Sequence, residues 1–375
     1  MVVLIIATLA CKEEVQLDSQ NNKNLLVVEG LITNLPGPYI IKLSLSSSIE
    51  KPMIIPYSGC TITLIDNLGN SELLTEKTPG NYYTAESGMQ GTIGNGYSIS
   101  IVTPDGKTLK TDFQVLKDTI GIDSAYAEYV EKELLGYVYD VPALQFFINT
   151  KISSVPDNYF LWTMTETYEY DIDHPILYYE NKWGDKIFYD TTYNVFKTCW
   201  AVENVKYIYT GKTNNLNNPQ IIHQPLHIVT TETKKLTKKY GVLIYQYVID
   251  EQAYNYWQYI EKQSADNDYL FSSQPYAIKG NVKNIDNQDE MVLGYFTVAS
   301  ISQKKLFVNA LNGPFYYSTC VVITDKAAIA EYIKNHEAPF FFVENDQGMV
   351  GLTYPDCIDC RKAGGYLEKP DLWIY

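Results

Sequence analysis

Histidine is scarce in this sequence, and the motifs of common enzymes are missing. The chain of 375 residues has 4 histidines: His174, His223, His227 and His336. His223 and His227 have the spacing of two metal ligands on one helical turn, but Pro225 between them argues against a helix, so we expect strand or loop histidines. The sequence also lacks a Gly-x-Ser-x-Gly motif, a phosphate-binding glycine loop and a calcium-binding loop. We therefore predict no catalytic residue, no metal site, no cofactor and no enzymatic activity.

Long hydrophobic runs and positive charge are also scarce. No segment after Cys11 has the about 18 uninterrupted apolar residues of a transmembrane helix, so we expect the rest of the chain to be soluble. Lys and Arg number 29 against 44 Asp and Glu, and the net charge of −15 would be repelled by phosphate backbones, which excludes nucleic acid as an expected partner. One basic cluster departs from this trend, and we expect it to be a solvated loop rather than a binding patch. Its members are Lys234, Lys235, Lys238 and Lys239.

The chain begins with a short apolar run that ends at a cysteine. In the stretch "LIIATLACKEE" the run is about as long as the core of a secretory signal and too short to cross a bilayer. Ala10 before Cys11 suits a bacterial lipoprotein signal, in which the cysteine is acylated and becomes the new N-terminus. Thr8 stands where leucine is usual, and the absence of a basic residue before the run would be explained by an upstream start. We predict a signal peptide over residues 1–10 and lipidation of Cys11; the alternative is a frayed N-terminus with a buried thiol.

The residues after Cys11 indicate where the protein is anchored. Lys12, Glu13 and Glu14 resemble a surface-export tag of some Bacteroidota lipoproteins, although a charged start to a solvated linker is the alternative. The residues that follow this tag are mostly polar, so we interpret residues 11–24 as the lipidated cysteine and a tether. Acyl chains hold a soluble domain at a membrane without a transmembrane helix. We expect a protein anchored by lipid to the outer membrane and exposed at the cell surface, or alternatively on the periplasmic face.

The N-terminal third has the alternation of antiparallel strands. Ile41, Leu43 and Leu45 alternate with polar neighbours, and Cys60 follows the same rule in its strand, so we expect it to be a small buried hydrophobe. About seven short strands separated by turns are typical of an immunoglobulin-like antiparallel β-sandwich. We predict this domain over residues 25–116. Its expected strands cover 25–33, 39–49, 60–66, 81–85, 96–103 and 107–116.

Residues 117–375 are predicted to form a larger β-rich domain with two short helices. The first helix, over 250–265, begins at the capping residue Asp250 and repeats apolar residues on one face, so it should lie on a sheet. The second helix, over 325–336, begins at Asp325 and carries positive charge near its C-terminal end. The expected strands cover 143–150, 158–170, 186–193, 240–248, 291–302, 304–310 and 316–324.

The pair Cys357 and Cys360 in "CIDC" allows three interpretations. Half of a zinc site is disfavoured because no second half is present, and a thioredoxin-like redox pair is disfavoured because the surrounding tail is rich in Pro, Gly and Asp. We favour a structural disulfide, either within the pair or from it to Cys199 or Cys320. If Cys11 is acylated, an odd number of the 6 cysteines remains, so one thiol is left over or paired locally.

The C-terminal tail carries two side chains of types that often bind ligands. A segment clamped by cysteines and reaching Trp373 is expected to fold back onto the second domain as a strap, with the tryptophan filling a pocket. The alternative is that Arg361 and Trp373 line a ligand site, because arginine and tryptophan are common binding anchors.

The chain resembles an uncharacterised lipoprotein family of Bacteroidota, domain of unknown function 4249. The stretch "QPYAIKGNVKNIDNQDEMVLGYFTVASISQKKLFV" (274–308) carries the resemblance, together with "EQAYNYWQYI" before it, "CIDCRKAGGYLEKPDLW" near the end and the opening "LLVVEGLIT". The matching residues are Gln274, Pro275, Gly280, Asn281, Gly294, Tyr295, Phe296, Cys357, Cys360, Arg361, Gly364, Gly365, Lys369, Pro370 and Trp373. Members are commonly encoded beside TonB-dependent outer-membrane receptors, which implies a role at the same membrane.

These observations favour a binding or accessory role. The chain has 33 tyrosines, a residue that suits both strands and ligand-facing surfaces. We expect a non-enzymatic, surface-facing outer-membrane lipoprotein that is an accessory or substrate-capture partner of a TonB-dependent transporter. The alternative is an independent glycan- or protein-binding, adhesin-like lipoprotein, and an extracytoplasmic hydrolase is a third, less favoured hypothesis.

Overall fold

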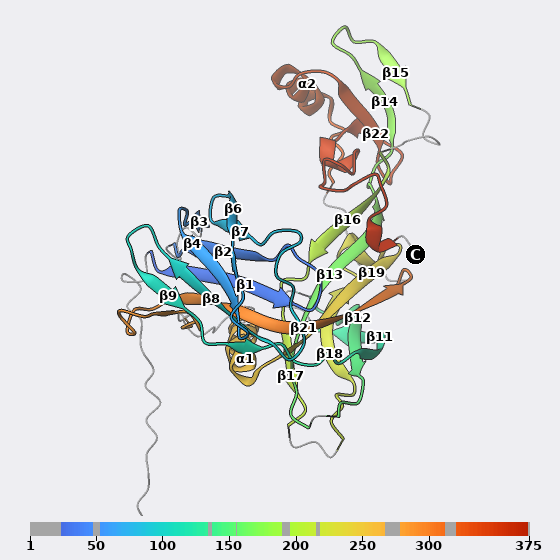
Figure 1. Ribbon diagram of the computed structural model, residues 1–375. Coiled ribbons are helices and arrows are strands. Elements are labelled where there is room, and N and C mark those ends of the chain that lie inside the picture. Colours follow the sequence, from blue (N-terminus) through green and yellow to red (C-terminus); the bar gives the residue numbers. More distant parts are fainter. Residues whose placement is uncertain are drawn as a thin grey trace, which may run out of the picture. The chain divides into compact units, whose positions relative to one another are not determined.

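The computed structural model describes residues 24–47, 53–133, 137–154, 156–189, 196–214, 218–266, 278–311 and 320–373. It divides into two compact units: a first unit of Met1–Thr119 and Val248–Ile301, and a second unit of Ile120–Tyr247 and Ser302–Tyr375 (Figure 1). The predicted signal peptide, the lipidation site and the export tag lie outside the described residues, as do Gln274 and Pro275 of the family pattern.

The first unit contains two β-sheets. One sheet has the order β21-β1-β2-β7-β6, with β3 paired to β2, and the other has the order β20-β9-β8-β4-β5, with β10 paired to β8. The strands of the first sheet are β1 (Leu26–Thr33), β2 (Ile40–Leu45), β3 (Ile55–Pro56), β6 (Thr75–Thr78), β7 (Asn81–Tyr83) and the first part of β21 (Leu293–Val308). The strands of the second sheet are β4 (Thr61–Asp66), β5 (Ser71–Leu73), β8 (Gly96–Val102), β9 (Thr108–Lys110), β10 (Gln114–Val115) and β20 (Lys283–Asn284).

The two sheets of the first unit enclose one hydrophobic core. Ile41 and Leu43 of β2 belong to the same cluster as Ile62 and Leu64 of β4, and all four are at most 1% exposed. Burying an aliphatic side chain of this size stabilises a fold by roughly 1.5–3 kcal/mol. The apolar residues that alternate along each strand therefore stabilise the packing of the two sheets. Cys60 lies in this cluster as a free thiol whose pKa burial raises to about 11, which confirms the prediction of a small buried hydrophobe.

One strand pairing departs from the predicted antiparallel sandwich. β1 pairs in parallel with β21, from Val27 opposite Leu293 to Thr33 opposite Ala299. Residues 248–301, which the sequence placed in the second domain, therefore belong to the first unit, while the predicted boundary near 117 lies close to the observed end at Thr119. Parallel strands need a long connection, and here that connection contains most of the first unit and residues 120–247 of the second unit, so no local pattern could reveal the pairing.

The second unit contains three groups of strands. The first has the order β16-β13-β19-β21 with β17 paired to β13, the second has the order β11-β12-β18, and the third has the order β15-β14-β22-β23. The first group comprises β13 (Tyr159–Asp171), β16 (Thr198–Asn204), β17 (Tyr209–Lys212), β19 (Tyr240–Ile249) and the second part of β21; the second comprises β11 (Ile122–Lys132), β12 (Val141–Thr150) and β18 (Gln224–Thr230). The third comprises β14 (Ile176–Glu180), β15 (Lys186–Phe188), β22 (Phe340–Glu344) and β23 (Val350–Leu352). Short 3-10 helices lie at Lys234–Leu236, Pro355–Cys357 and Asp371–Trp373.

Both predicted helices are present, and the mainly β fold class is confirmed. Helix α1 (Glu251–Asp266) begins after Asp250, whose Oδ1 accepts a hydrogen bond of 2.7 Å from Ala253 N. Helix α2 (Lys326–Asn335) begins after Asp325, whose Oδ1 accepts one of 2.9 Å from Ala328 N. In both cases a side-chain oxygen satisfies a backbone N–H that the first turn leaves without a partner, which is why Asp marks the start of each helix.

The predicted strands are correct in most places and incomplete in others. The two strands expected at 291–302 and 304–310 form one continuous strand, β21. Of the strand expected at 316–324, the structure describes residues from Cys320 onward, where Ile323 forms an isolated bridge with Leu352. The sequence did not predict the short strands β3, β5, β6 and β20 of the first unit, nor β11, β14, β16, β17, β18, β22 or β23 of the second unit.

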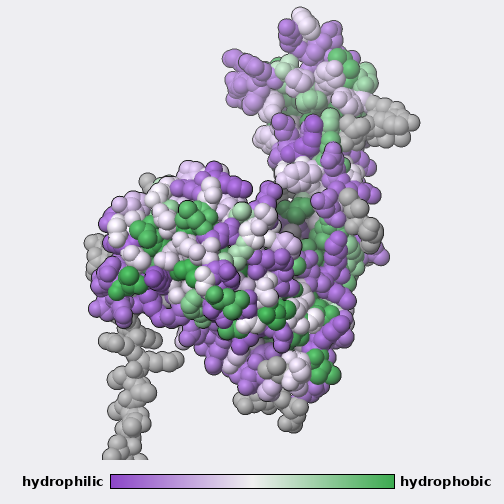
Figure 2. Space-filling model, in the orientation of Figure 1, coloured by the Kyte–Doolittle hydropathy of each residue, from purple (hydrophilic) through white to green (hydrophobic). Residues whose placement is uncertain are grey.

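The surface is mostly hydrophilic on the face that Figure 2 shows, with hydrophobic residues in small separate areas. Trp183 and Phe188 are among the exposed large hydrophobic side chains, at 74% and 76%, and both belong to the β14–β15 hairpin. Within the described ranges, no helix has the length and apolar character needed to cross a membrane.

Candidate functional site

The four cysteines near the C-terminal tail form two disulfides. Cys199 pairs with Cys360 and Cys320 pairs with Cys357, each with a Cα–Cα distance of 5.7 Å. This confirms the interpretation of a structural disulfide extending from the "CIDC" pair to Cys199 and Cys320. Because all four sulfurs are engaged in these bonds, the pair serves as two separate attachment points for the tail.

Trp373 and Arg361 are both engaged within the second unit. Trp373 is 8% exposed, its Nε1 donates a hydrogen bond of 2.8 Å to Thr167 Oγ1, and its ring meets that of Trp200 edge-on at 6.4 Å. The Arg361 guanidinium donates to both carboxylate oxygens of Asp359, at 3.0 and 2.7 Å, and lies over the Phe196 ring at 3.8 Å. Their partners are different side chains of the same unit, which supports the strap interpretation for this segment.

The basic cluster is not the solvated loop that the sequence predicted. Lys234 pairs with Asp173 at 2.9 Å and Lys238 pairs with Asp171 at 2.7 Å. Lys235 contacts the carboxylate of Glu166, which is 3% exposed. The lysines on and after the 3-10 helix Lys234–Leu236 thus neutralise acidic residues on and just after β13, a contact that becomes visible only once the two segments are placed in space.

The Glu166 cluster makes the second unit sensitive to acid. Burial opposes ionisation of Glu166, but the neighbouring His227, Lys235 and Tyr240 side chains outweigh it and lower the pKa of the Glu166 carboxyl from 4.5 to about 2. A depressed pKa in the folded state stabilises the fold above the unfolded pKa and is lost as the pH falls through the folded one. We expect about 3 kcal/mol of stabilisation to disappear between about pH 4.5 and pH 2.

Urea unfolding of wild type and Glu166→Gln measures this effect. The difference in unfolding free energy between the two proteins should shrink as the pH is lowered from about 6 to about 3. Glu128→Gln, on an exposed position of β11, is the matched control and should follow the wild type. Parallel pH profiles for wild type and Glu166→Gln would contradict the assignment.

The histidine pair does not form a metal site on a helix. His227 lies in β18, and His223 precedes that strand with a positive φ of 56°, as expected from Pro225 between them. Nδ1 of His223 is 2.7 Å from the Tyr126 hydroxyl, and its ring stacks on Phe147 at 4.0 Å. Among the described residues, no group of three His, Cys, Asp or Glu side chains could hold a metal ion.

The first unit contains a pocket of about 380 Å³. Its wall is built by residues from β10, from helix α1, from the segment leading to β20 and from the start of β21. The residues that matter for its chemistry are Gln114, Tyr256, Tyr259, Gly280, Asn281 and Tyr295. The family pattern had singled out Gly280, Asn281 and Tyr295, and the structure brings these three residues together.

Two glycines allow the backbone segments of the pocket wall to approach closely. Gly294 has a positive φ of 78°, and a Cβ placed there would overlap the carbonyl oxygen of Val28 on β1. A Cβ at Gly280 would overlap the carbonyl oxygen of Gly294 itself. Glycine is needed at both positions because no side chain fits between these backbones.

Side-chain amides then extend the hydrogen bonding of β21. Asn281 donates through Nδ2 to Phe296 O at 2.7 Å and accepts through Oδ1 from Phe296 N at 2.9 Å. Gln114 Nε2 donates to the same carbonyl oxygen at 2.7 Å. The carbonyl oxygen of Phe296 can only accept, so this bond fixes the orientation of the Gln114 amide and leaves its Oε1 on the other side.

Two buried polar atoms of the pocket wall have no hydrogen-bond partner in the described part of the chain. They are Oε1 of Gln114 and the hydroxyl of Tyr295, whose residues are 5% and 6% exposed. A buried polar atom without a partner costs about 1–3 kcal/mol. Both atoms have almost no accessible surface, so they lie behind the lining of the pocket.

Tyrosine rings form one side of the pocket. The rings of Tyr256 on α1 and Tyr295 on β21 lie 4.7 Å apart, and Tyr259 is 45% exposed one turn further along the helix. Burial and the nearby Glu29 raise the pKa of Tyr256 to about 12. Burial, together with Asp250 and Tyr256, raises the pKa of Tyr295 as well, so both phenols are neutral at physiological pH.

Charged residues of the pocket lie at exposed positions. Lys283 and Asp112 pair at 2.7 Å, with side-chain exposures of 52% and 75%. Lys279 Nζ donates a hydrogen bond of 3.0 Å to the carbonyl oxygen of Gln288. The deeper part of the wall therefore offers neutral phenol and amide groups.

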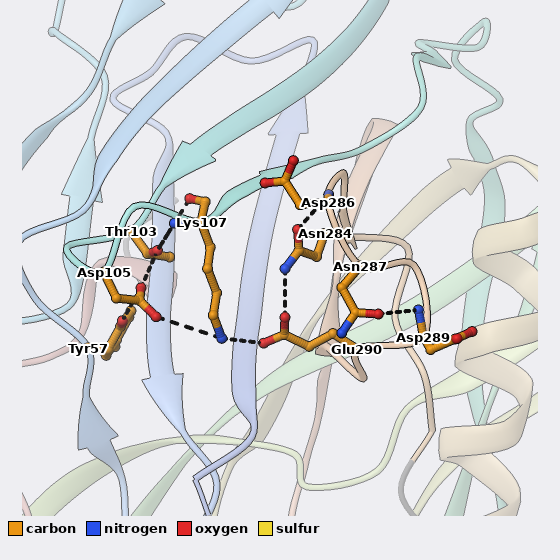
Figure 3. Close-up of polar contacts among 9 residues, drawn as sticks. All are labelled: Tyr57, Thr103, Asp105, Lys107, Asn284, Asp286, Asn287, Asp289 and Glu290. Carbon is orange, nitrogen blue, oxygen red and sulfur yellow. Dashed lines mark hydrogen bonds and ion pairs between the residues drawn. The ribbon is translucent and has the colours of Figure 1, made fainter.

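A polar cluster holds the segment after β20 against the β8–β9 turn (Figure 3). Lys107 Nζ lies 2.7 Å from Glu290 and 3.7 Å from Asp105, and Asn284 Nδ2 donates to Glu290 at 2.6 Å. Asp105 in turn accepts from Thr103. Because residues 278–281 and Lys283 line the pocket just before this segment, the cluster anchors one wall of the pocket.

Sequence reasoning missed part of this site. Gln114 gives no local signal because it follows an ordinary strand pattern, and Tyr256 and Tyr259 look like other residues of an amphipathic helix. The glycines were the available signal: an Asn after Gly280 and a Tyr after Gly294 suggest functional side chains next to close backbone approaches.

The fold and this pocket define a mainly β protein of two units, the first of which carries a ligand-sized cavity lined by phenols and amides. The chain belongs to the family described as Domain of unknown function (DUF4249), whose model matches residues 12–305. This confirms the family inferred from the sequence. The match includes every pocket residue and ends before Cys320, so the motif residues from 357 to 373 lie outside it. No curated protein matches the chain.

Proposed function

We propose that this protein is a surface-facing outer-membrane lipoprotein and a non-enzymatic accessory or substrate-capture partner of a TonB-dependent transporter. The observation that carries the capture role is the pocket of about 380 Å³, whose lining combines tyrosine rings with amide and charged side chains. A concave site with aromatic faces and a few polar groups is suited to holding a small ligand.

The proposed location depends on the first residues of the chain. Cys11 after a short apolar run provides the lipid anchor, and Lys12, Glu13 and Glu14 provide the surface-export tag. A lipid-anchored unit at the outer face would present its pocket to external ligands beside a barrel, while anchorage at the periplasmic face is the alternative. Both place the pocket on the route of a transported substrate.

A native pull-down tests the partnership. Tagged full-length protein is purified from detergent-solubilised outer membranes, with Cys11→Ala as the variant that lacks the anchor. We expect one TonB-dependent barrel to co-purify stoichiometrically with the wild type and to be depleted with Cys11→Ala. Recovery of the lipidated protein alone would contradict the accessory role.

The alternative function is an independent glycan- or protein-binding, adhesin-like lipoprotein. It is favoured by the exposed aromatic side chains Trp183 and Phe188 on the β14–β15 hairpin of the second unit. Such rings supply contact area at low entropic cost. Specific retention of the protein on polysaccharide, without any barrel and lost in Trp183→Ala, would favour this function over the first.

A further inference from the structure

We propose that the open edge of strand β11 in the second unit is a docking site for an extended, positively charged segment of another protein. In this mode of binding the incoming segment adds a strand to the sheet, and backbone hydrogen bonds supply much of the affinity. The inference goes beyond the proposed function and depends neither on the pocket nor on the transporter.

Strand β11 is an outer strand of the three-stranded sheet β11-β12-β18. It pairs with β12 over its whole length and ends with Lys132 opposite Val141. In an antiparallel pair, about half of the backbone N–H and C=O groups of an outer strand point away from its neighbour. Among the described residues, no segment other than β12 pairs with the backbone from Ser124 to Lys132, so this row of donors and acceptors is open.

Strand β11 lacks the features that commonly protect an edge strand. Protected edges are short, or are interrupted by proline, by bulges or by lysines. The strand has 11 residues, contains neither proline nor glycine, and has its irregularity at the start, between Ile122 and Ser124. Its one lysine, Lys132, is the last residue. A long and regular open edge of this kind is the arrangement to which a further strand can add.

Exposed aromatic and apolar side chains lie near one end of this edge. Tyr129 is 55% exposed, and Val138 and Tyr139 are 89% and 80% exposed. Val138 and Tyr139 come shortly before Val141, the residue opposite Lys132, so they lie at the end of the strand to which Tyr129 is nearer. Tyrosines are common anchors of protein interfaces because they bury a large area at low entropic cost. An added strand would therefore find side-chain contacts there besides the backbone hydrogen bonds.

The charge of β11 favours a basic partner. Glu128, Glu131 and Glu133 are exposed on and directly after the second half of the strand, against one lysine. At the other end, Lys304 Nζ donates to the Asp123 carbonyl oxygen at 3.4 Å. Opposite charges across two strands stabilise their pairing, and like charges destabilise it. The added strand should therefore carry Lys or Arg where it meets the three glutamates.

A second copy of this chain fits the edge less well. An antiparallel pairing of two β11 strands centred on Ala127 would place Asp123 of one copy opposite Glu131 of the other. Like charges would then face each other on both sides of the centre. We therefore assign the edge to a different protein, whose segment is basic and free of proline where it pairs.

Selection from a library of random linear peptides of about 10 residues, the length of a long strand, tests the proposal. Detergent-solubilised, full-length wild type and the double variant Glu128→Lys/Glu131→Lys are used in parallel selections. Glu331→Lys/Glu337→Lys, at exposed positions on and after α2 in the same unit, is the matched control. We expect wild type and the control to select peptides rich in Lys and Arg, and these peptides should bind the β11 variant roughly 10-fold more weakly.

Backbone methylation of a selected peptide separates strand addition from contacts between side chains. Alternate N–H groups of an added strand bond to β11, and the others point away. Methylating one alternate set should abolish binding, whereas methylating the other set should preserve it. Binding of the unmethylated peptide should also slow amide hydrogen exchange in residues 124–132, measured by mass spectrometry, and leave α2 unchanged.

Several results would overturn the proposal. They are equal binding of the basic peptides to wild type and the β11 variant, equal effects of the two methylated sets, protection of amides outside β11 alone, and a selection that yields no peptide dependent on Glu128 and Glu131. A dimer of wild type with protected β11 amides would assign the edge to a second copy, and would overturn the proposed partner as well.

Discussion

Gly294→Ala is expected to lower the free energy of unfolding of the first unit by about 3 kcal/mol or more. Two costs add at this position. The φ of 78° is unfavourable for any residue with a Cβ, and the new methyl group would overlap the backbone of Val28 at the point where β21 pairs with β1. Neither backbone can yield without breaking the parallel pairing, and Tyr295 of the pocket follows directly in the chain.

Gly94→Ala is the matched control for this prediction. Gly94 also has a positive φ, of 88°, but a Cβ there would meet nothing within 4 Å. Its replacement should cost about 1–2 kcal/mol, from the backbone conformation alone. Urea unfolding monitored by circular dichroism gives both values. Equal destabilisation by the two variants would show that the close approach of β21 to β1 is not as tight as described.

Removal of the Cys199–Cys360 disulfide by replacing both residues with alanine is expected to destabilise the second unit by about 5 kcal/mol. The two cysteines are separated by 161 residues in the sequence, so the bond removes a large loop entropy from the unfolded chain. Alanine is the appropriate replacement because both side chains are fully buried and a serine hydroxyl would add an unpaired polar group.

The second disulfide gives the comparison. Cys320 and Cys357 are 37 residues apart, so replacing this pair with alanine should cost about 4 kcal/mol, less than the first pair. Tryptophan fluorescence can follow both variants, because Trp200 is next to Cys199 and its ring lies against Trp373. A larger loss for the Cys320–Cys357 pair would show that local packing, and not loop length, decides the contribution of these bonds.

Local sequence patterns were sufficient to predict the elements that are stabilised by contacts between nearby residues. Ile41 and Leu43 alternate with polar residues and point into the core, and Asp250 and Asp325 cap the helices that follow them. The tail could also be interpreted, because a Cys-x-x-Cys pair without a second pair of metal ligands, in a chain that we expect to be exported, favours structural disulfides. The strands and helix caps depend on neighbours within a few residues, and the interpretation of the cysteine pair depends on counting the possible metal ligands.

The remaining features depend on contacts between distant segments. The parallel pairing of Val28 with Gly294 joins residues on either side of the second unit, and the ion pairs from Lys234 and Lys238 to the acids at the end of β13 join a 3-10 helix region to a strand. For the same reason Gln114 could not be assigned to a site from the sequence. Its role depends on the carbonyl oxygen of Phe296, which lies 182 residues further along the chain.

The most direct test of capture by this pocket is native mass spectrometry of protein purified from the outer membranes of cells that make it. Wild type and Tyr259→Ala, which removes a 45% exposed ring of the pocket lining, are purified in parallel and compared for non-covalent adducts. If the pocket captures a small ligand, the wild type should carry an adduct that is reduced or absent in Tyr259→Ala. The same adduct at the same occupancy in both proteins, or none in either, would contradict capture by this pocket.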